Sequence, residues 1–150
     1  MKAVRSVSAV FPCYNDENTI AKLVDDVYEV LEPMVDDVEV IVVNDGSGDG
    51  SRAVLDALAL ERPWFRPIHH EKNGGYGAAL RTGFEAARHD WIFYTDGDAQ
   101  YDPREMASLW KALDDDVDWV NGYKISRSDP LHRIVIGRIY HHTVRLLFRL

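Results

Sequence analysis

The chain contains 150 residues, of which 46% are hydrophobic and 28% are charged, and this composition predicts one domain with its own core rather than a disordered chain. Its net charge of −8 at pH 7 argues against a nucleic-acid-binding domain, whose body would be basic. No uncharged apolar run reaches the roughly 18 residues of a membrane span. The single cysteine, Cys13, excludes an internal disulfide and indicates a reducing compartment.

Short apolar segments alternate with longer amphipathic ones, which is the pattern of an α/β fold with a mostly parallel open sheet. The first apolar run lacks a cleavage pattern, so it is interpreted as a strand and not as a signal peptide. Strands are predicted at residues 4–11, 38–43, 66–69, 91–95 and 117–122. Helices are predicted at 16–31, 51–60, 78–88, 103–113 and 130–150, with Ser51 as a helix cap. No linker interrupts this series, so residues 1–150 are expected to form one domain.

Polar, turn-forming clusters follow four of the predicted strands. They are Tyr14-Asn15-Asp16-Glu17, Asn44-Asp45-Gly46-Ser47, the turn with Gly74, Gly75 and Gly77, and Asp96-Gly97-Asp98. In open α/β sheets the ligand binds beyond the carboxyl ends of the strands, so we expect a site where these clusters meet. The glycines allow close approach of the backbone to a ligand. They match neither GxGxxG nor GxxxxGK[ST], the two common nucleotide fingerprints.

Asp96 and Asp98 are the strongest candidates for a metal site. Two carboxylates two residues apart in extended chain point to the same side, and Gln100 adds a neutral oxygen two residues further on. Hard oxygen ligands of this kind suit Mg²⁺ or Mn²⁺ and leave coordination positions open for a diphosphate. The alternative interpretation is a surface turn, because Asp-Gly is a favoured turn dipeptide.

The ends of the first two strands carry candidates for nucleoside contacts. Asp45 can accept the N–H of a uracil or guanine base. Alternatively, Asn44 or Asp45 can form an Asx-turn by bonding the backbone of its own loop. Pro12 and Tyr14 leave the first strand together with Glu17. The aromatic ring can stack on a base and Glu17 can reach a ribose hydroxyl, whereas Asn15 or Asp16 can equally serve as the cap of the following helix.

Four ordered segments resemble family 2 glycosyltransferases: VSAVFPCYNDENTI, VEVIVVNDGSGDGS, EKNGGYGAALRTGF and WIFYTDGDAQYDP. The form DGDAQYDP is similar, more narrowly, to the dolichol-phosphate and polyprenyl-phosphate mannosyl- and glucosyltransferases. The resemblance covers nearly the whole chain. It implies the GT-A fold, with a nucleotide-sugar-binding half at 1–123 and the start of an acceptor-side region at 124–150.

The resemblance also implies roles for individual residues. Pro12, Tyr14, Glu17 and Asp45 would contact the nucleoside. Asp96 would lie beside the ribose, the diphosphate and the metal, and Asp98 and Gln100 would bind the metal, which makes both aspartates catalytic. The segment NGYKISRSDPLHRIVIGR is similar to the stretch where such enzymes bind the acceptor phosphate, with Lys124, Arg127, Arg133 and Arg138 as the candidates. Lys124 stands where arginine is expected, and lysine cannot form the bidentate contact.

The function implied is metal-dependent, inverting transfer of a hexose from a GDP- or UDP-linked sugar to a polyprenyl or dolichyl phosphate. Such a phosphate has a second pKa of about 6, so it is already a nucleophile near neutral pH and needs no strong base. Two alternatives stay open: a saccharide hydroxyl acceptor in cell-surface polysaccharide synthesis, which needs a base, and a truncated nucleotide-binding domain without transfer activity. A nucleotidylyltransferase is disfavoured because FPCYNDE occupies the place of its glycine- and basic-rich loop.

Residues 131–150 contain four arginines, Arg133, Arg138, Arg145 and Arg149, and no acidic residue. They predict an interfacial helix on anionic lipid, or else a core-packing helix whose arginines are solvated or pair with the acidic body. A lipid-linked acceptor favours the first, with a cytoplasmic chain at the cytoplasmic face of a membrane. Because family members continue well beyond this point, the chain is expected to be truncated. The six histidines are interpreted as surface or packing residues.

Overall fold

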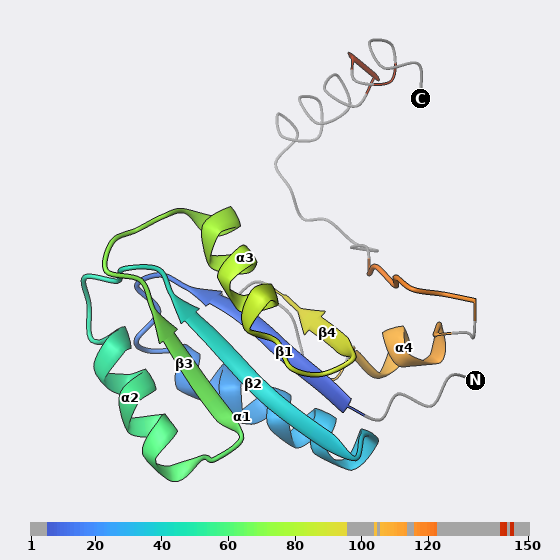
Figure 1. Cartoon of the computed structure of the whole chain (residues 1–150), viewed down its shortest axis with the longest axis horizontal. Helices are drawn as coiled ribbons and strands as arrows, with labels where there is room; N and C mark the ends of the chain where they lie inside the picture. The colour runs from blue at the N-terminus through green and yellow to red at the C-terminus, as the bar shows by residue number, and fades with distance from the viewer. Residues whose placement is uncertain are drawn as a thin grey trace. The chain divides into compact units, whose positions relative to one another are not determined.

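A computed structural model describes residues 6–95, 104, 106–113, 116–122, 142, 143 and 145. Its centre is a parallel sheet with the strand order β3-β2-β1-β4 (Figure 1). The strands are β1 (Ser6–Cys13), β2 (Asp37–Asn44), β3 (Phe65–His69) and β4 (Trp91–Tyr94). Residues 40–43 of β2 are fully buried, as expected for a strand that helices cover on both faces.

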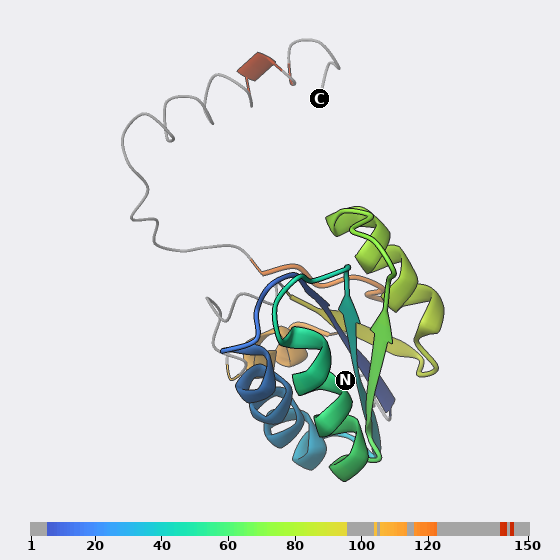
Figure 2. The same ribbon diagram turned by 90° about the vertical axis from the view of Figure 1, so that its left-hand side faces the viewer.

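Helices cover both faces of the sheet (Figure 2). They are α1 (Ile20–Leu31), which runs into the short 3₁₀ helix η1 (Glu32–Met34), α2 (Ser51–Glu61), α3 (Tyr76–Ala86) and α4 (Met106–Lys111). Helix α1 forms because its apolar residues recur every three or four positions, which gives it one buried stripe. Helices α1 and α2 lie on one face and α3 lies on the other.

The alternation of side chains along β1 divides the core into two parts. Ala9 and Phe11 point into the larger core, which α1, α2 and α4 close. Val10 points into the smaller core beneath α3, together with Ile41 and Val43. Helix α3 lies so close to the sheet that a Cβ on Gly83 would stand 2.3 Å from Cγ1 of Val10. Glycine therefore sets the distance between α3 and the sheet.

The predicted parallel sheet and its flanking helices are confirmed, with differences at the helix starts; α3, for example, begins at Tyr76 and not at residue 78. Helix α1 begins at Ile20 and not at residue 16, because the Asp16 carbonyl accepts the N–H groups of Thr19 and Ile20 in a preceding turn. Ser51 is the first residue of α2 and not its cap. Its N–H instead donates to the Asp49 carboxylate over 3.0 Å.

The predicted fifth strand at 117–122 is wrong, since the structure assigns no strand to residues 116–122. These residues pair with no strand among the described part of the chain, and Trp119 is 69% exposed. A strand needs a neighbour to satisfy its backbone N–H and C=O groups. An apolar pattern in the sequence does not supply that neighbour.

The chain divides into two compact units, Met1–Val120 and Asn121–Leu150. The first holds the sheet and the helices α1 to α4. In the second, His142, Thr143 and Arg145 are helical, in agreement with the predicted C-terminal helix at those positions. Among the described residues no helix is long and apolar enough to cross a membrane. The assignment of 1–123 and 124–150 to donor and acceptor halves stays a prediction.

Candidate functional site

The loop after β1 is fastened to the loop after β2 by reciprocal hydrogen bonds. Asn15 donates its N–H to Ser47 Oγ over 3.0 Å, and its own side-chain Oδ1 accepts the N–H of Gly48 over 2.9 Å. Asn15 has a φ of +59°, a conformation that asparagine tolerates better than most residues. The two loops therefore form one rigid surface at the carboxyl edge of the sheet.

Two acidic residues strengthen the same junction at the start of α2. Glu17 Oε2 accepts the N–H of Gly50 over 2.6 Å, and Asp49 Oδ2 accepts the N–H of Glu17 over 3.1 Å. Hydrogen bonds from Ser51, first of all from its side chain, lower the pKa of Asp49. Glu17, predicted to reach a ribose, is exposed at this junction, where one of its oxygens already binds the protein backbone.

The Asp45 carboxylate connects the loop after β2 to the glycine turn before α3. Its Oδ1 accepts the N–H of Gly74 over 2.9 Å, and its Oδ2 accepts the N–H of Gly75 over 2.8 Å. Gly75 has a φ of +87° and is the residue that precedes α3. Asp45 itself is only 3% exposed. Of the two residues predicted as able to bond their own loop, it is Asn44 that does so, since its Oδ1 accepts the N–H of Ser47.

Opposing effects act on the ionisation of Asp45. Burial raises its pKa, but the hydrogen bonds from the Gly74 N–H, His70 and the Gly75 N–H outweigh burial, and the pKa is lowered below 3.8. Asp45 is therefore an ionised carboxylate at neutral pH, and its oxygens act only as acceptors.

Two histidines at the end of β3, interpreted from the sequence as surface or packing residues, make side-chain hydrogen bonds at this edge. His70 Nδ1 lies 2.7 Å from Asp45 Oδ1, and its Nε2 lies 2.9 Å from Thr82 Oγ1 on α3. His69 Nδ1 lies 3.2 Å from the Asn44 amide nitrogen. His69 ends the predicted strand 66–69 and His70 directly follows it, so the sequence places both at the edge where the other clusters meet.

Three of the four predicted clusters therefore converge as expected. Tyr14, predicted to stack on a base, is 51% exposed at this edge, and Pro12 is half-buried beside it in β1. The fourth cluster follows β4, whose last residue, Tyr94, pairs with Val10. Seven predicted residues lie outside the described residues: Asp96, Asp98, Gln100, Lys124, Arg127, Arg133 and Arg138.

Two further kinds of functional group are relevant among the described residues, metal-binding clusters and the Cys13 thiol. The described residues contain no group of three or more His, Cys, Asp or Glu side chains placed to hold a metal ion, so the predicted metal site depends on residues 96–100. The Cys13 thiol at the end of β1 is buried, and burial raises its pKa to about 11. A thiol of this kind stays protonated and unreactive near neutral pH.

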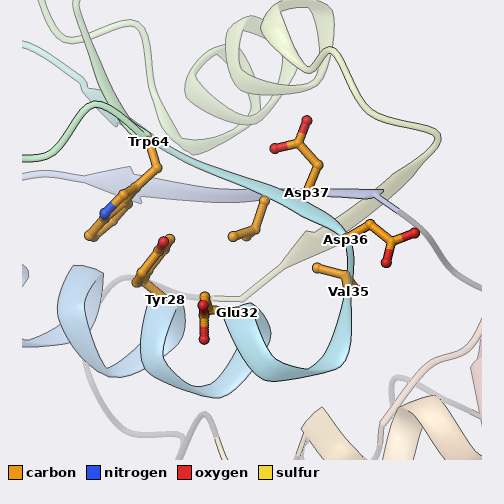
Figure 3. Close-up of a pocket in the computed structure, with 7 residues that line it drawn as sticks. Tyr28, Glu32, Val35, Asp36, Asp37 and Trp64 are labelled. Carbon is orange, nitrogen blue, oxygen red and sulfur yellow. The ribbon is translucent and has the colours of Figure 1, made fainter.

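A shallow hollow of about 240 Å³ lies at the other end of the sheet, near the start of β2 (Figure 3). It is lined by Tyr28, Glu32, Val35, Asp36, Asp37, Val38 and Trp64. The rings of Tyr28 and Trp64 stack with their centroids 3.7 Å apart. None of the predicted site residues lines this hollow, so the carboxyl edge remains the candidate site.

Comparison with known proteins identifies the family of the chain. The model of the family described as glycosyl transferase family 2 matches residues 8–146. The chain belongs to glycosyl transferase family 2. Residues 8–146 include β2 to β4, all of β1 except its first two residues, and every predicted donor-site and metal-site residue.

Two relatives are named as sugar transferases, and the name of the first contains undecaprenyl phosphate. Undecaprenyl-phosphate 4-deoxy-4-formamido-L-arabinose transferase of Aeromonas hydrophila is 31% identical over 95% of this chain and 44% of its own length. Glycosyltransferase AglD of Haloferax volcanii is 35% identical over 95% of this chain and 24% of its own length. The chain thus spans less than half the length of these relatives.

Solved structures confirm the predicted GT-A fold. The mannosyltransferase PcManGT from Pyrobaculum calidifontis, in complex with GDP-Man and Mn²⁺, is 27% identical with a TM-score of 0.59, over 68% of this chain and 30% of that one. Glucosyl-3-phosphoglycerate synthase from Mycobacterium tuberculosis, in complex with Mn²⁺, UDP and glucosyl-3-phosphoglycerate, is 26% identical with a TM-score of 0.57. That likeness covers 71% of this chain and 39% of the synthase.

Proposed function

We propose that this chain carries the donor site of an enzyme that transfers a hexose from a nucleoside diphosphate sugar to a polyprenyl phosphate, with inversion at the anomeric carbon. The observation that supports the donor site is the joined carboxyl edge, where the loops after β1 and β2 and the glycine turn are held together by hydrogen bonds. The lipid phosphate acceptor is supported by the names of the relatives.

The nucleoside binds at the surface formed by these loops. Tyr14 offers an exposed ring for stacking on the base, and base–aromatic stacking contributes about 1–3 kcal/mol. Asp45 accepts a base N–H, Pro12 lines the same edge, and Glu17 lies where a ribose hydroxyl is expected. Because hydrogen bonds fix the loops before the ligand arrives, little ordering is needed on binding.

Asp96, Asp98 and Gln100 would hold a Mg²⁺ or Mn²⁺ ion next to the diphosphate. All three are oxygen donors of the kind these ions prefer, and they begin two residues after β4 ends at the same edge of the sheet. A bound ion would neutralise charge on the departing nucleoside diphosphate. The Mn²⁺ in the complexes of two similar structures agrees with this cofactor.

The acceptor phosphate is proposed to bind to basic residues that follow the sheet in the sequence. Lys124, Arg127, Arg133 and Arg138 are proposed to bind the acceptor phosphate, the arginines by paired N–H donors and Lys124 as a point charge. The phosphate is already ionised and attacks the anomeric carbon without a strong base. The arginines of residues 131–150 are further proposed to rest on anionic lipid at the cytoplasmic face of a membrane.

The proposal is tested by titrating the purified chain with UDP and GDP by calorimetry, with and without Mn²⁺, beside the variant Asp98→Ala. We expect Mn²⁺-dependent binding of one nucleotide, weakened at least about tenfold in the variant. Asp90→Ala, a change at an exposed position before β4, is the matched control and should bind as the parent chain does. A folded chain that binds neither nucleotide would contradict the donor site.

Transfer is then measured separately with a radiolabelled sugar nucleotide and undecaprenyl phosphate in detergent. Product at pH 7 without a hydroxyl acceptor supports the lipid phosphate, because its nucleophile needs no base. Binding of the nucleotide without any transfer would keep the donor site and reject the chain as a complete catalyst. Transfer to a saccharide hydroxyl alone would replace the proposed acceptor.

A further inference from the structure

The Asp45 carboxylate has few hydrogen-bonding positions left for a ligand. An ionised carboxylate offers about four acceptor positions, two on each oxygen. Oδ1 already receives the Gly74 N–H and His70 Nδ1, and Oδ2 receives the Gly75 N–H. The protein therefore occupies both positions on Oδ1 and one on Oδ2, so one position on Oδ2 remains.

His70 is fixed as a donor to Asp45 by its contacts at both ring nitrogens. Because the carboxylate can only accept, Nδ1 must carry the proton that faces Oδ1. In the neutral ring Nε2 is then the acceptor, and it receives the hydroxyl hydrogen of Thr82 at 2.9 Å. The imidazole is thus held in one tautomer and one orientation, from the end of β3 and from α3.

The two candidate bases differ in the number of donors that they present to a carboxylate. Uracil has one imide N–H between two carbonyl groups, so it offers a single donor. Guanine has an N–H and an adjacent amino group, and together these pair with both oxygens of a carboxylate. A buried donor that finds no acceptor costs about 1–3 kcal/mol, so the number of free positions on Asp45 determines which base fits.

We infer that His70 is a specificity-determining residue that selects a uracil-type donor over a guanine-type donor, by filling the second acceptor position on Asp45 Oδ1. The inference rests on the proposed function, in which Asp45 contacts the base. His70 acts through Asp45 and not on the ligand itself, so it is a positioning residue. The donor class that follows is a UDP-linked sugar.

The test compares the dissociation constants of UDP and GDP, because the two ligands share the ribose and the diphosphate and differ only in the base. The folded parent chain, with Mn²⁺ present, is expected to bind UDP about 10- to 100-fold more tightly than GDP. His70→Ala frees the second position on Oδ1, so the preference should fall to about threefold or less. His70→Asn keeps an N–H donor near Asp45 and should retain most of the preference.

His89→Ala is the matched control, because its side chain is 16% exposed, close to the 20% of His70, and its partner is Asp37 at the amino edge. It should leave the preference unchanged. The inference is overturned if the parent chain prefers GDP or neither nucleotide, or if His70→Ala keeps the full preference for UDP. The nucleotide preference of the parent chain can be measured even if a variant does not fold. Absence of binding to both nucleotides would instead reject the donor site itself.

Discussion

Each edge of the sheet contains a buried carboxylate, and the two differ in what neutralises them. At the carboxyl edge, Asp45 is held by two backbone N–H groups and a histidine. At the amino edge, Glu39 accepts the Ser8 hydroxyl over 2.7 Å and the Arg88 N–H over 2.8 Å, and pairs with Arg66 at 3.2 Å. Asp45 thus has no arginine or lysine among its partners in the described residues, whereas Glu39 has one.

The two carboxylates also differ in their position relative to β2. Glu39 lies within β2 and joins the strand to the segment between α3 and β4, and its charge is satisfied by Arg66. Asp45 follows the same strand at the edge where ligands bind in open α/β sheets. Asp45 is therefore the candidate for a binding role, because it lies at that edge and pairs with no arginine or lysine of the described residues.

The largest effect is expected at Asp45. Asp45→Asn replaces one acceptor by an NH₂ group that faces backbone N–H donors, so the free energy of unfolding should fall by about 2–4 kcal/mol. Nucleotide binding should be lost in the molecules that remain folded. Urea unfolding and calorimetry measure the two effects, and unchanged stability would show that the carboxylate does not hold the glycine turn.

The pH dependence of the free energy of unfolding provides a second test of Asp45→Asn. Because the folded pKa of Asp45 lies below its ordinary value of 3.8, its contribution to stability is complete above about pH 4 and is lost as the pH falls through the folded pKa. The stability difference between the parent chain and Asp45→Asn should therefore shrink below pH 4. A difference that grew on acidification would contradict this assignment.

A smaller effect, of a different kind, is expected at the amino edge. Glu39→Gln keeps the acceptor for Ser8 and Arg88 but removes the charge that pairs with Arg66, so the free energy of unfolding should fall by about 1–3 kcal/mol. The affinity for UDP should stay unchanged, since this network lies at the other end of the strands. If Glu39→Gln also lost affinity for UDP, the proposed difference between the two edges would be contradicted.

The smallest effect on stability is expected at Tyr14, whose ring is 51% exposed. Tyr14→Ala should change the free energy of unfolding by no more than about 0.5 kcal/mol. Loss of base stacking should weaken nucleotide binding by about tenfold. Tyr14→Phe is the control that keeps the stacking face, and it should bind as the parent chain does. Equal nucleotide affinity in the parent chain, Tyr14→Ala and Tyr14→Phe would contradict the assignment of Tyr14 to the site.

The sequence alone determined the parallel α/β architecture, because strand and helix periods are local properties that do not depend on distant residues. It also predicted which edge holds the candidate site, since the polar clusters after β1, β2 and β3 stand at strand ends that a parallel sheet must bring together. The ordered motifs gave the family. What these patterns cannot encode is which side chain each cluster contacts.

Those contacts were decided by the tertiary structure. The bonds that connect Asp45 to Gly74, Gly75 and His70 join residues 25 to 30 positions apart, and no local pattern fixes such pairings. The same reason explains why the fifth strand predicted at 117–122 is wrong and why the sequence did not predict the hydrogen bonds of His69 and His70. A strand depends on a neighbour and a histidine on its hydrogen-bond partners, and both come from elsewhere in the folded chain.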